Sequence, residues 1–343
     1  MKSECCMSYS EIEHKSQMPC NDGKRFGNIE ALRVGLMFLV VLGHVCLYGH
    51  FSGSLLAKGM HTCTIFAVDT FALISGWFGI KFSWGRIAKF MWLGLFCSLV
   101  LWGLSDSQEG FHYSLGWFGL AYFALMFLAP ALKDFSSSRS YFIYAGIMVV
   151  NWLPIGWLGI NLKIPGWGGT TFNTIMFMYV TGRFLRSATR IDSFTLRQCA
   201  VSAVILLSAC CAWSAIGGFS EYGTAQYFIF IGSLDNNSPL VIALSIAVFL
   251  FFLRIPVPCF ISKICTFLSP SMFSVYLLHD GCNGPLSRSF YAKWMCDDFG
   301  LGWIGCMLSV ILTTIMIMVA CIFIDLLRRI IELLLRFKWD IVR

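Results

Sequence analysis

The sequence predicts an all-α, polytopic membrane protein with about ten transmembrane helices and with both termini in the cytoplasm. Of its 343 residues, 57% are hydrophobic and only 13% are charged. The mean hydropathy is +0.73, which is far outside the range of soluble domains. The apolar residues form long runs, not the alternating segments of about ten residues that build an outer-membrane barrel. A helical bundle in the cytoplasmic (inner) membrane is therefore expected.

Ten apolar stretches can serve as the spans of this bundle. A span needs about 20 mostly apolar residues, because ~30 Å of hydrocarbon is crossed at 1.5 Å per residue. The stretches are 28–48, 63–80, 87–104, 114–132, 141–159, 169–186, 198–217, 238–253, 266–280 and 301–325. Pro154 interrupts the fifth, and the ninth is short and contains Pro270. An additional half-buried segment over 222–232 is left open.

The basic residues predict the orientation of the bundle. If the N-terminus is cytoplasmic, nearly all of the 25 lysines and arginines fall on the cytoplasmic side; the exceptions are Lys58, Lys163, Arg288 and Lys293. Such an excess is typical of cytoplasmic loops, and an even number of spans follows. The expected parts are a cytoplasmic tail over 1–27, a transmembrane domain over 28–325 and a basic amphipathic cytoplasmic tail over 326–343. Because the cations are scattered between apolar runs, no nucleic-acid partner is expected.

The 15 cysteines indicate neither a metal site nor a redox motif, since no C-x-x-C pair occurs. Most of them lie within apolar runs, where cysteine behaves as a small hydrophobic residue. Cys282 and Cys296 share one predicted outer loop. A disulfide between them is left open, because it depends on whether that side is oxidising.

Two polar residues of the first span are the strongest candidates for function, because ionisable groups inside a bilayer are costly. Arg33 and His44 are separated by ten residues, which places them ~16 Å apart along a helix and on roughly the same face. Arg33 would lie at the cytoplasmic end and could bind an anion, or serve only as a positive anchor. His44 would lie in the outer half as a base, or as a helix–helix hydrogen-bonding group.

Further candidates follow in the second, fourth and ninth spans. Asp69 lies at a depth similar to that of His44 and could orient its imidazole. Ser75 and the following glycine favour close helix packing over nucleophilic chemistry. Tyr276 and His279 lie near the outer rim of the ninth span. The outer aromatic residues could stack on a sugar ring or form an interfacial belt; they are Trp117, Tyr122, Trp167 and Tyr222.

Together these pieces resemble the acyltransferase 3 family of integral-membrane O-acyltransferases. The resemblance rests on Arg33-x10-His44, Phe71-Ala-Leu-Ile-Ser75-Gly76-Trp-Phe, Arg86-x2-Lys89, Trp117-Phe-Gly-Leu-Ala-Tyr122 and Tyr276-Leu-Leu-His279. It implies a bundle of roughly ten helices that moves an acyl group, usually acetyl, from acyl-CoA to a sugar hydroxyl of a cell-surface or exported polysaccharide. It also implies that His44 is the catalytic histidine and that Arg33 serves the acyl-CoA. The acidic residue that many relatives carry after the Trp117 motif is missing, and Lys89 stands where arginine is commoner.

The residues and the resemblance lead to one hypothesis. Acyl-CoA, a co-substrate and not a permanently bound cofactor, docks its phosphates on Arg33, Arg86 and Lys89, and its thioester reaches His44. Asp69 supports the imidazole, while the acceptor glycan or lipid-linked sugar contacts residues on the outer side, namely Ser75, Trp117, Tyr122, Tyr276 and His279. His44 acts as a general base or as a nucleophile. The alternative functions are a transporter or flippase for a lipid-linked glycan, and a membrane scaffold.

Overall fold

The computed structural model describes residues 26–49, 55–104, 111, 113–132, 138–152, 172–218, 234–280 and 301–334. These residues are helical or irregular, and none of them lies in a strand. Each of the ten predicted stretches contains a helix. The helices are α2 (Gly27–Tyr48), α4 (Ala67–Phe78), α5 (Trp84–Leu104), α6 (Gly116–Leu128), α7 (Ser138–Trp152), α8 (Phe172–Ser187), α9 (Leu196–Gly218), α11 (Pro239–Arg254), α13 (Met272–Asp280) and α15 (Gly302–Leu334).

Shorter elements not predicted from the sequence connect these helices. They are α3 (Leu55–Thr62), the 3₁₀ helix η3 (Thr189–Ser193), α12 (Cys259–Leu268) and the 3₁₀ turn η4 (Ser269–Ser271). Pro270 lies in η4, where its missing N–H interrupts the helical hydrogen bonds and separates α12 from α13. The optional segment over 222–232, the loop with Cys282 and Cys296, and the two aromatic residues Trp167 and Tyr222 lie outside the described residues.

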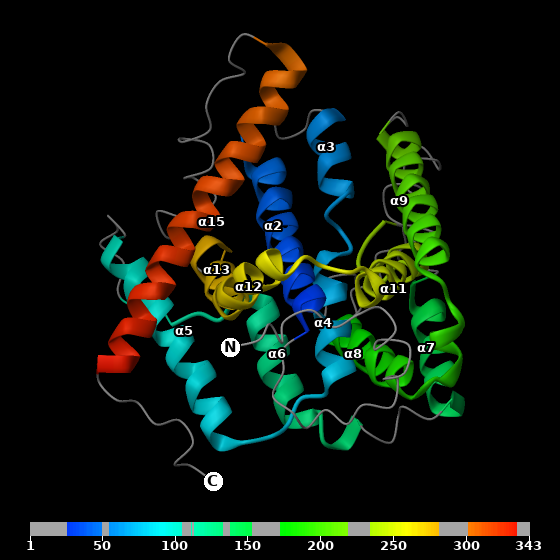
Figure 1. The fold of residues 1–343 in the computed structure, drawn as a ribbon, viewed down its shortest axis with the longest axis horizontal. Coiled ribbons are helices and arrows are strands. Elements are labelled where there is room, and N and C mark those ends of the chain that lie inside the picture. Colours follow the sequence, from blue (N-terminus) through cyan, green and yellow to red (C-terminus); the bar gives the residue numbers. More distant parts are fainter. Residues whose placement is uncertain are drawn as a thin grey trace.

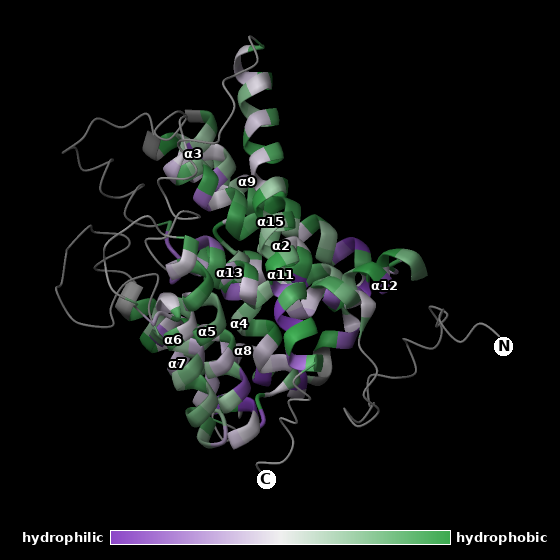
Figure 2. Cartoon of the chain, turned by 90° about the vertical axis from the view of Figure 1, so that its left-hand side faces the viewer, coloured by the Kyte–Doolittle hydropathy of each residue, from purple (hydrophilic) through white to green (hydrophobic). Residues whose placement is uncertain are grey.

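Five stretches of helix are long and apolar enough to cross a membrane: Gly27–Tyr48, Trp84–Gly103, Leu196–Ile216, Cys259–Asp280 and Gly302–Leu334. Other apolar helices, such as α6 and α11, are shorter than a span requires. Most of the helical ribbon in Figure 2 has the colour of hydrophobic residues, and large apolar side chains such as Phe142, Trp303 and Phe323 are exposed. An exposed apolar surface of this extent suits a multi-pass membrane protein.

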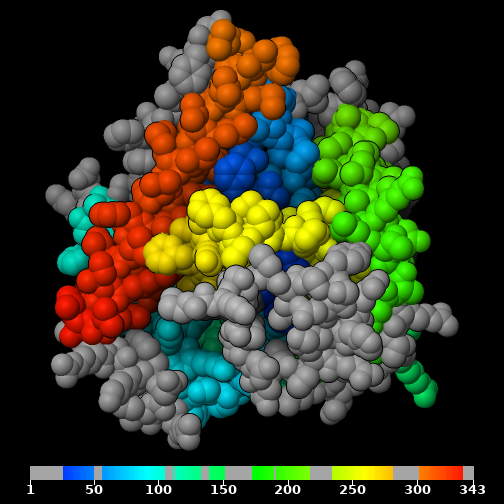
Figure 3. Space-filling view, in the orientation of Figure 1, coloured from blue at the N-terminus to red at the C-terminus, as the bar shows by residue number. Residues whose placement is uncertain are grey.

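Helix α2 is the centre of the bundle. It contacts α3, α4, α11, α12, α13 and α15, and it lies between α15 and α9 in Figure 1. In the same view, the segment from α11 to α13 crosses the surface between these two outer helices (Figure 3). Of the side chains on α2, Leu32, Leu36 and Val41 are almost fully buried. Both polar candidates of the first span are therefore carried by a central helix that contacts six others.

Two glycines bring α4 and α8 into backbone contact. A Cβ on Gly76 would lie 2.0 Å from the carbonyl oxygen of Tyr179, and a Cβ on Gly182 would lie 2.2 Å from that of Leu73. Ser75 Oγ donates a hydrogen bond to Phe71 O of its own helix at 3.0 Å. Small residues at an interface allow helices to approach closely. The packing interpretation of the Ser-Gly pair is thereby confirmed for Gly76.

A buried ionic cluster joins α15 to the α12–α13 region. Asp325 is fully buried, and it accepts hydrogen bonds from Arg328 Nε at 2.8 Å and from Arg329 Nε at 2.9 Å. Ser274 Oγ of α13 donates to the same carboxylate. Because both cations and the hydroxyl satisfy its oxygens, the charge can be buried. α15 continues past this cluster to Leu334, so its last residues belong to the predicted amphipathic tail.

Candidate active site

The structure brings His44 and His279 into direct contact, although they are far apart in the chain. His44 Nδ1 lies 2.9 Å from His279 Nε2, and the ring centroids are 5.1 Å apart. His279 is fully buried, whereas the His44 side chain is 21% exposed. The sequence predicted that His279 binds substrate at the outer rim. In the structure its ring is buried and contacts His44.

The partners of His279 define the proton positions in this pair. His279 Nδ1 lies 2.7 Å from the carbonyl oxygen of Val275, and a carbonyl can only accept, so this nitrogen carries the proton. In a neutral His279, Nε2 is then an acceptor, and His44 Nδ1 must be its donor. Neutral His44 consequently carries its lone pair on Nε2. One backbone carbonyl thus sets the tautomer of both rings.

The carboxylate beside His44 belongs to Asp280, not to Asp69. Asp280 Oδ2 lies 3.9 Å from His44 Nε2, the nitrogen that would take up a proton. Asp69 is fully buried and its Oδ1 accepts from Asn236 Nδ2 at 3.3 Å. Its Oδ2 has no hydrogen-bond partner in the described part of the chain. The pairing of Asp69 with His44 expected from equal depth is therefore not what the structure contains.

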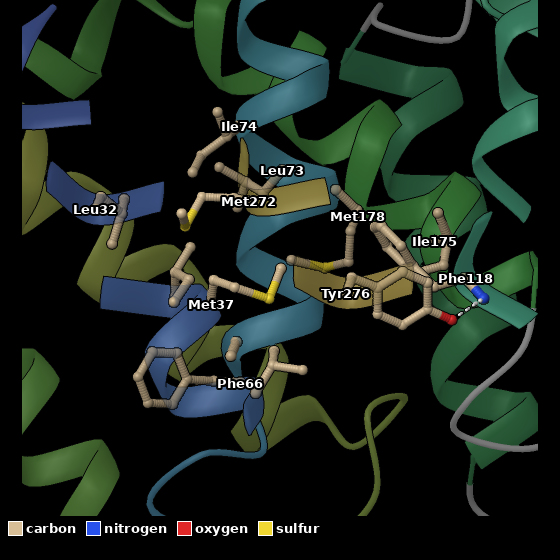
Figure 4. Close-up of a cluster of buried hydrophobic side chains, with 14 of the residues drawn as sticks. Leu32, Met37, Phe66, Leu73, Ile74, Phe118, Ile175, Met178, Met272 and Tyr276 are labelled. Atoms are coloured by element: carbon tan, nitrogen blue, oxygen red, sulfur yellow. Dashed lines mark hydrogen bonds between the residues drawn. The ribbon is translucent and has the colours of Figure 1, made fainter. Parts of the chain in front are cut away.

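Tyr276 supports the beginning of α6 below these histidines. Its hydroxyl accepts a hydrogen bond from Phe118 N at 3.1 Å (Figure 4), one of the N–H groups that a helix start leaves unpaired. Gly116 has φ +62°, and a Cβ there would lie 2.5 Å from this hydroxyl. Tyr276 is 4% exposed, so it holds α6 in place and has no ring face for a sugar. Its expected role in substrate binding stays a prediction, and the contact that the structure shows is with the start of α6.

The two aromatic candidates of α6 differ in exposure. Trp117 is 37% exposed and sits in the first turn, next to the residue that Tyr276 binds. Tyr122 is half-buried, and its ring lies parallel to Phe90 of α5 at 5.9 Å. Of the two, Trp117 retains an exposed ring, whereas the Tyr122 ring is used for helix packing.

At the other end of α2, Arg33 lies against the end of α4. Its Nη1 donates to Glu30 Oε1 at 2.8 Å, and its guanidinium lies 5.6 Å from the centroid of the Phe78 ring. The Arg33 side chain is 31% exposed. Glu30 balances part of this charge, but the exposed fraction leaves donors for an anion.

A second guanidinium, which sequence reasoning assigned only to topology, reaches the same end of α4. A Cβ on Gly79 would lie 2.9 Å from Arg183 Nη1 of α8, and Gly79 has φ +75°, a conformation that favours glycine. Arg183 is half-buried, and its Nε has no hydrogen-bond partner among the described residues. A buried donor without a partner is costly, so this nitrogen is a candidate to donate a hydrogen bond to a bound anion.

The other two expected cations are less enclosed. Arg86 is exposed, and its Nη1 donates to the carbonyl oxygen of Lys81 at 3.1 Å; Lys89 is exposed on the next turn of α5. The α2 face between Arg33 and His44 is packed, since Met37 is 5% and Val40 is 9% exposed. The two ends of α2 therefore form separate sites in this arrangement, a cation pair at one end and a histidine pair at the other.

Comparison with known families shows to which family the chain belongs. A family model described as an acyltransferase domain, of the acyltransferase 3 type, matches residues 26–326. The chain belongs to the acyltransferase 3 family. This confirms the family inferred from the motifs. The comparisons with curated proteins and with solved structures found no match.

For an acyltransferase, the histidine pair offers a base. A hydroxyl that attacks an acyl carbonyl must lose its proton in the transition state, and histidine is the side chain most often used to take it. His44 Nε2 carries the lone pair, and Asp280 stands where it would stabilise the protonated ring. Among the described residues, no group of three or more His, Cys, Asp and Glu is placed to hold a metal ion.

Proposed function

We propose that this membrane acyltransferase moves an acyl group, acetyl in the simplest case, from cytosolic acyl-CoA to a sugar hydroxyl of a cell-surface or exported polysaccharide. The observation that carries the proposal is the His44–His279 contact in a chain of this family. In this proposal the chain crosses the inner membrane ten times with both termini in the cytoplasm, following the distribution of its 25 lysines and arginines. His44 then lies in the outer half and Arg33 at the inner end.

The acceptor hydroxyl gives its proton to His44 Nε2 as its oxygen bonds to the thioester carbonyl. The carbon–sulfur bond then breaks, and CoA leaves as the thiolate. His279 keeps Nδ1 of His44 protonated, so that Nε2 is the basic nitrogen throughout. Asp280 stabilises the imidazolium from 3.9 Å. The open ring of Trp117 supplies a stacking surface for the sugar.

The donor is proposed to enter from the cytoplasmic end of α2. CoA is polyanionic, and Arg33 and Arg183 contact the consecutive residues Phe78 and Gly79. Two guanidiniums so placed can bind phosphate oxygens. The pantetheine arm must then pass Met37, whose unbranched side chain can adopt other rotamers more readily than a β-branched one. This step requires the packed face of α2 to open.

The function is tested by supplying acyl-CoA labelled in its acyl carbonyl to proteoliposomes that contain the protein, with surface polysaccharide of the source cell as the acceptor. Base-labile label should appear in the polysaccharide in proportion to the CoA thiol released. Proton-coupled movement of a lipid-linked glycan without consumption of acyl-CoA would contradict the proposal and would favour a transporter.

Arg183→Gln should raise the Michaelis constant for acyl-CoA roughly tenfold with little change in kcat, because a hydrogen bond to a charged group contributes about 1.5–3 kcal/mol. Arg197→Gln is the matched control, since that arginine is exposed at the start of α9 and is not assigned to the donor site. The two variants are compared with acyl-CoA and with an acyl donor that lacks the 3′-phosphate. Equal Michaelis constants for Arg183→Gln and the parent protein would remove Arg183 from the donor site.

A further inference from the structure

A pair of cysteines connects α9 to the segment between α3 and α4. Cys63 lies in the turn that follows α3, and Cys211 lies on α9. Their sulfur atoms are 3.8 Å apart, and both residues are half-buried, unlike Cys46, Cys210 and Cys306, which are buried. The two thiols therefore combine proximity with partial access.

We propose that Cys63 and Cys211 form a disulfide that joins the α3–α4 connection to α9. A disulfide has a sulfur–sulfur distance of about 2.05 Å. The sulfur atoms must approach by less than about 2 Å, a movement that side-chain rotation with a small backbone adjustment provides.

A hydrogen bond beside the two cysteines also connects the end of α3 to α9. Thr62 Oγ1, one residue before Cys63, is hydrogen-bonded at 2.8 Å to Ser214 Oγ, which lies about one helical turn after Cys211. Thr62 Oγ1 also lies 2.9 Å from the carbonyl oxygen of Lys58 within α3. The pair is thus held by a polar contact beside it, which favours formation of the bond without a large rearrangement.

The α3–α4 connection, which the disulfide would fix, lies against α2 beside His44. A Cβ on Gly43, the residue before His44, would lie 2.5 Å from Thr64 Oγ1 and 3.6 Å from His61 Cδ2. Residues 61–64 therefore pack directly on this part of α2. A covalent link from Cys63 to α9 would hold this segment closed over the helix that carries His44.

Formation of the bond requires an oxidant outside the cytoplasm. The two thiols lose two protons and two electrons, and a disulfide of an external oxidant is reduced to two thiols by exchange. One sulfur attacks that oxidant to give a mixed disulfide, and the second sulfur displaces the thiolate. The orientation rests on the proposed function, in which the ends of α2 and α9 that meet α3 face the non-cytoplasmic side, where disulfides persist.

The test counts thiols and maps the link, so it is independent of catalysis. Purified full-length protein is treated with diamide or with a reductant, alkylated, digested and analysed without reduction by mass spectrometry. In oxidised protein, Cys63 and Cys211 should both lose alkylation, and one linked peptide pair should contain these two residues. The link should persist in Cys210→Ser and disappear in Cys211→Ser.

Two results would overturn the inference. One is that Cys63 and Cys211 both remain alkylatable after diamide treatment; the other is that the link joins Cys63 to Cys210 and survives in Cys211→Ser. Membranes prepared with immediate alkylation should already contain the linked peptides. Reduced thiols there, together with rapid linkage by diamide, would contradict the outward orientation of the pair. The same measurements apply to the His44→Ala variant, so loss of transfer does not affect them.

Discussion

Replacement of His44 by alanine should lower the rate of acyl transfer by about 10²–10⁴-fold, the usual contribution of a positioned general base. The variant should still bind acyl-CoA, because Arg33 and Arg183 contact the opposite end of the bundle, at Phe78 and Gly79. The rate is measured as transfer of labelled acyl groups to polysaccharide, and donor binding is measured separately on the same preparation.

Two comparisons make this result specific. His61→Ala removes a histidine from a neighbouring segment and should leave the rate nearly unchanged. His279→Gln keeps one acceptor and one donor in place of the ring and should retain more activity than His279→Leu, because His44 Nδ1 needs an acceptor. If His44→Ala transferred acyl groups at the parental rate, His44 would not be the base. If the two His279 variants were equally active, His279 would not be the residue that keeps His44 Nδ1 protonated.

Replacement of Gly76 by alanine should destabilise the protein by about 1–3 kcal/mol, the usual cost of overpacking. The upper part of this range is expected because the obstruction is the backbone: a Cβ would lie 2.0 Å from Tyr179 O and 2.8 Å from its carbonyl carbon. The two helices must separate, since neither atom can rotate away. Loss of folded protein on heating in detergent, followed by size-exclusion chromatography, measures the effect.

Gly146→Ala is the matched control for this prediction. Gly146 also lies within a helix, α7, but a Cβ there would meet no atom within 4 Å. Since alanine is the better helix former by up to about 1 kcal/mol, this variant should be as stable as the parent or more so. Equal melting of Gly76→Ala and Gly146→Ala would show that α4 and α8 do not pack through their backbones.

Much of the fold could be predicted because helix formation in this chain is a local property. Runs of apolar residues gave a helix for each of the ten expected stretches, and Pro270 marked the break before α13. The connecting elements α3 and α12 were not predicted, since a helix of 8 or 10 residues does not stand out from its surroundings by hydropathy.

The site could be predicted only in part. The spacing of Arg33 and His44 identified the two ends of α2, because both lie on one helix whose geometry is fixed. Equal depth suggested Asp69 as the partner of His44, but depth does not specify which helices are neighbours or how each is rotated. Arg183 carried no signal beyond its charge. The approach of Arg183 to Gly79, where a Cβ would lie 2.9 Å from Arg183 Nη1, is visible only in the structure.

The sequence by itself determined that this is a helical membrane protein of one family, with a cation and an imidazole at fixed separation on its first span. Hydropathy and periodicity are sums over neighbouring residues, so they need no knowledge of the rest of the chain. The tertiary structure alone decided that His279 binds His44 and that Asp280 stands beside it. Those contacts join residues 235 and 236 positions apart, and they exist only because α13 packs against α2 in one particular rotation.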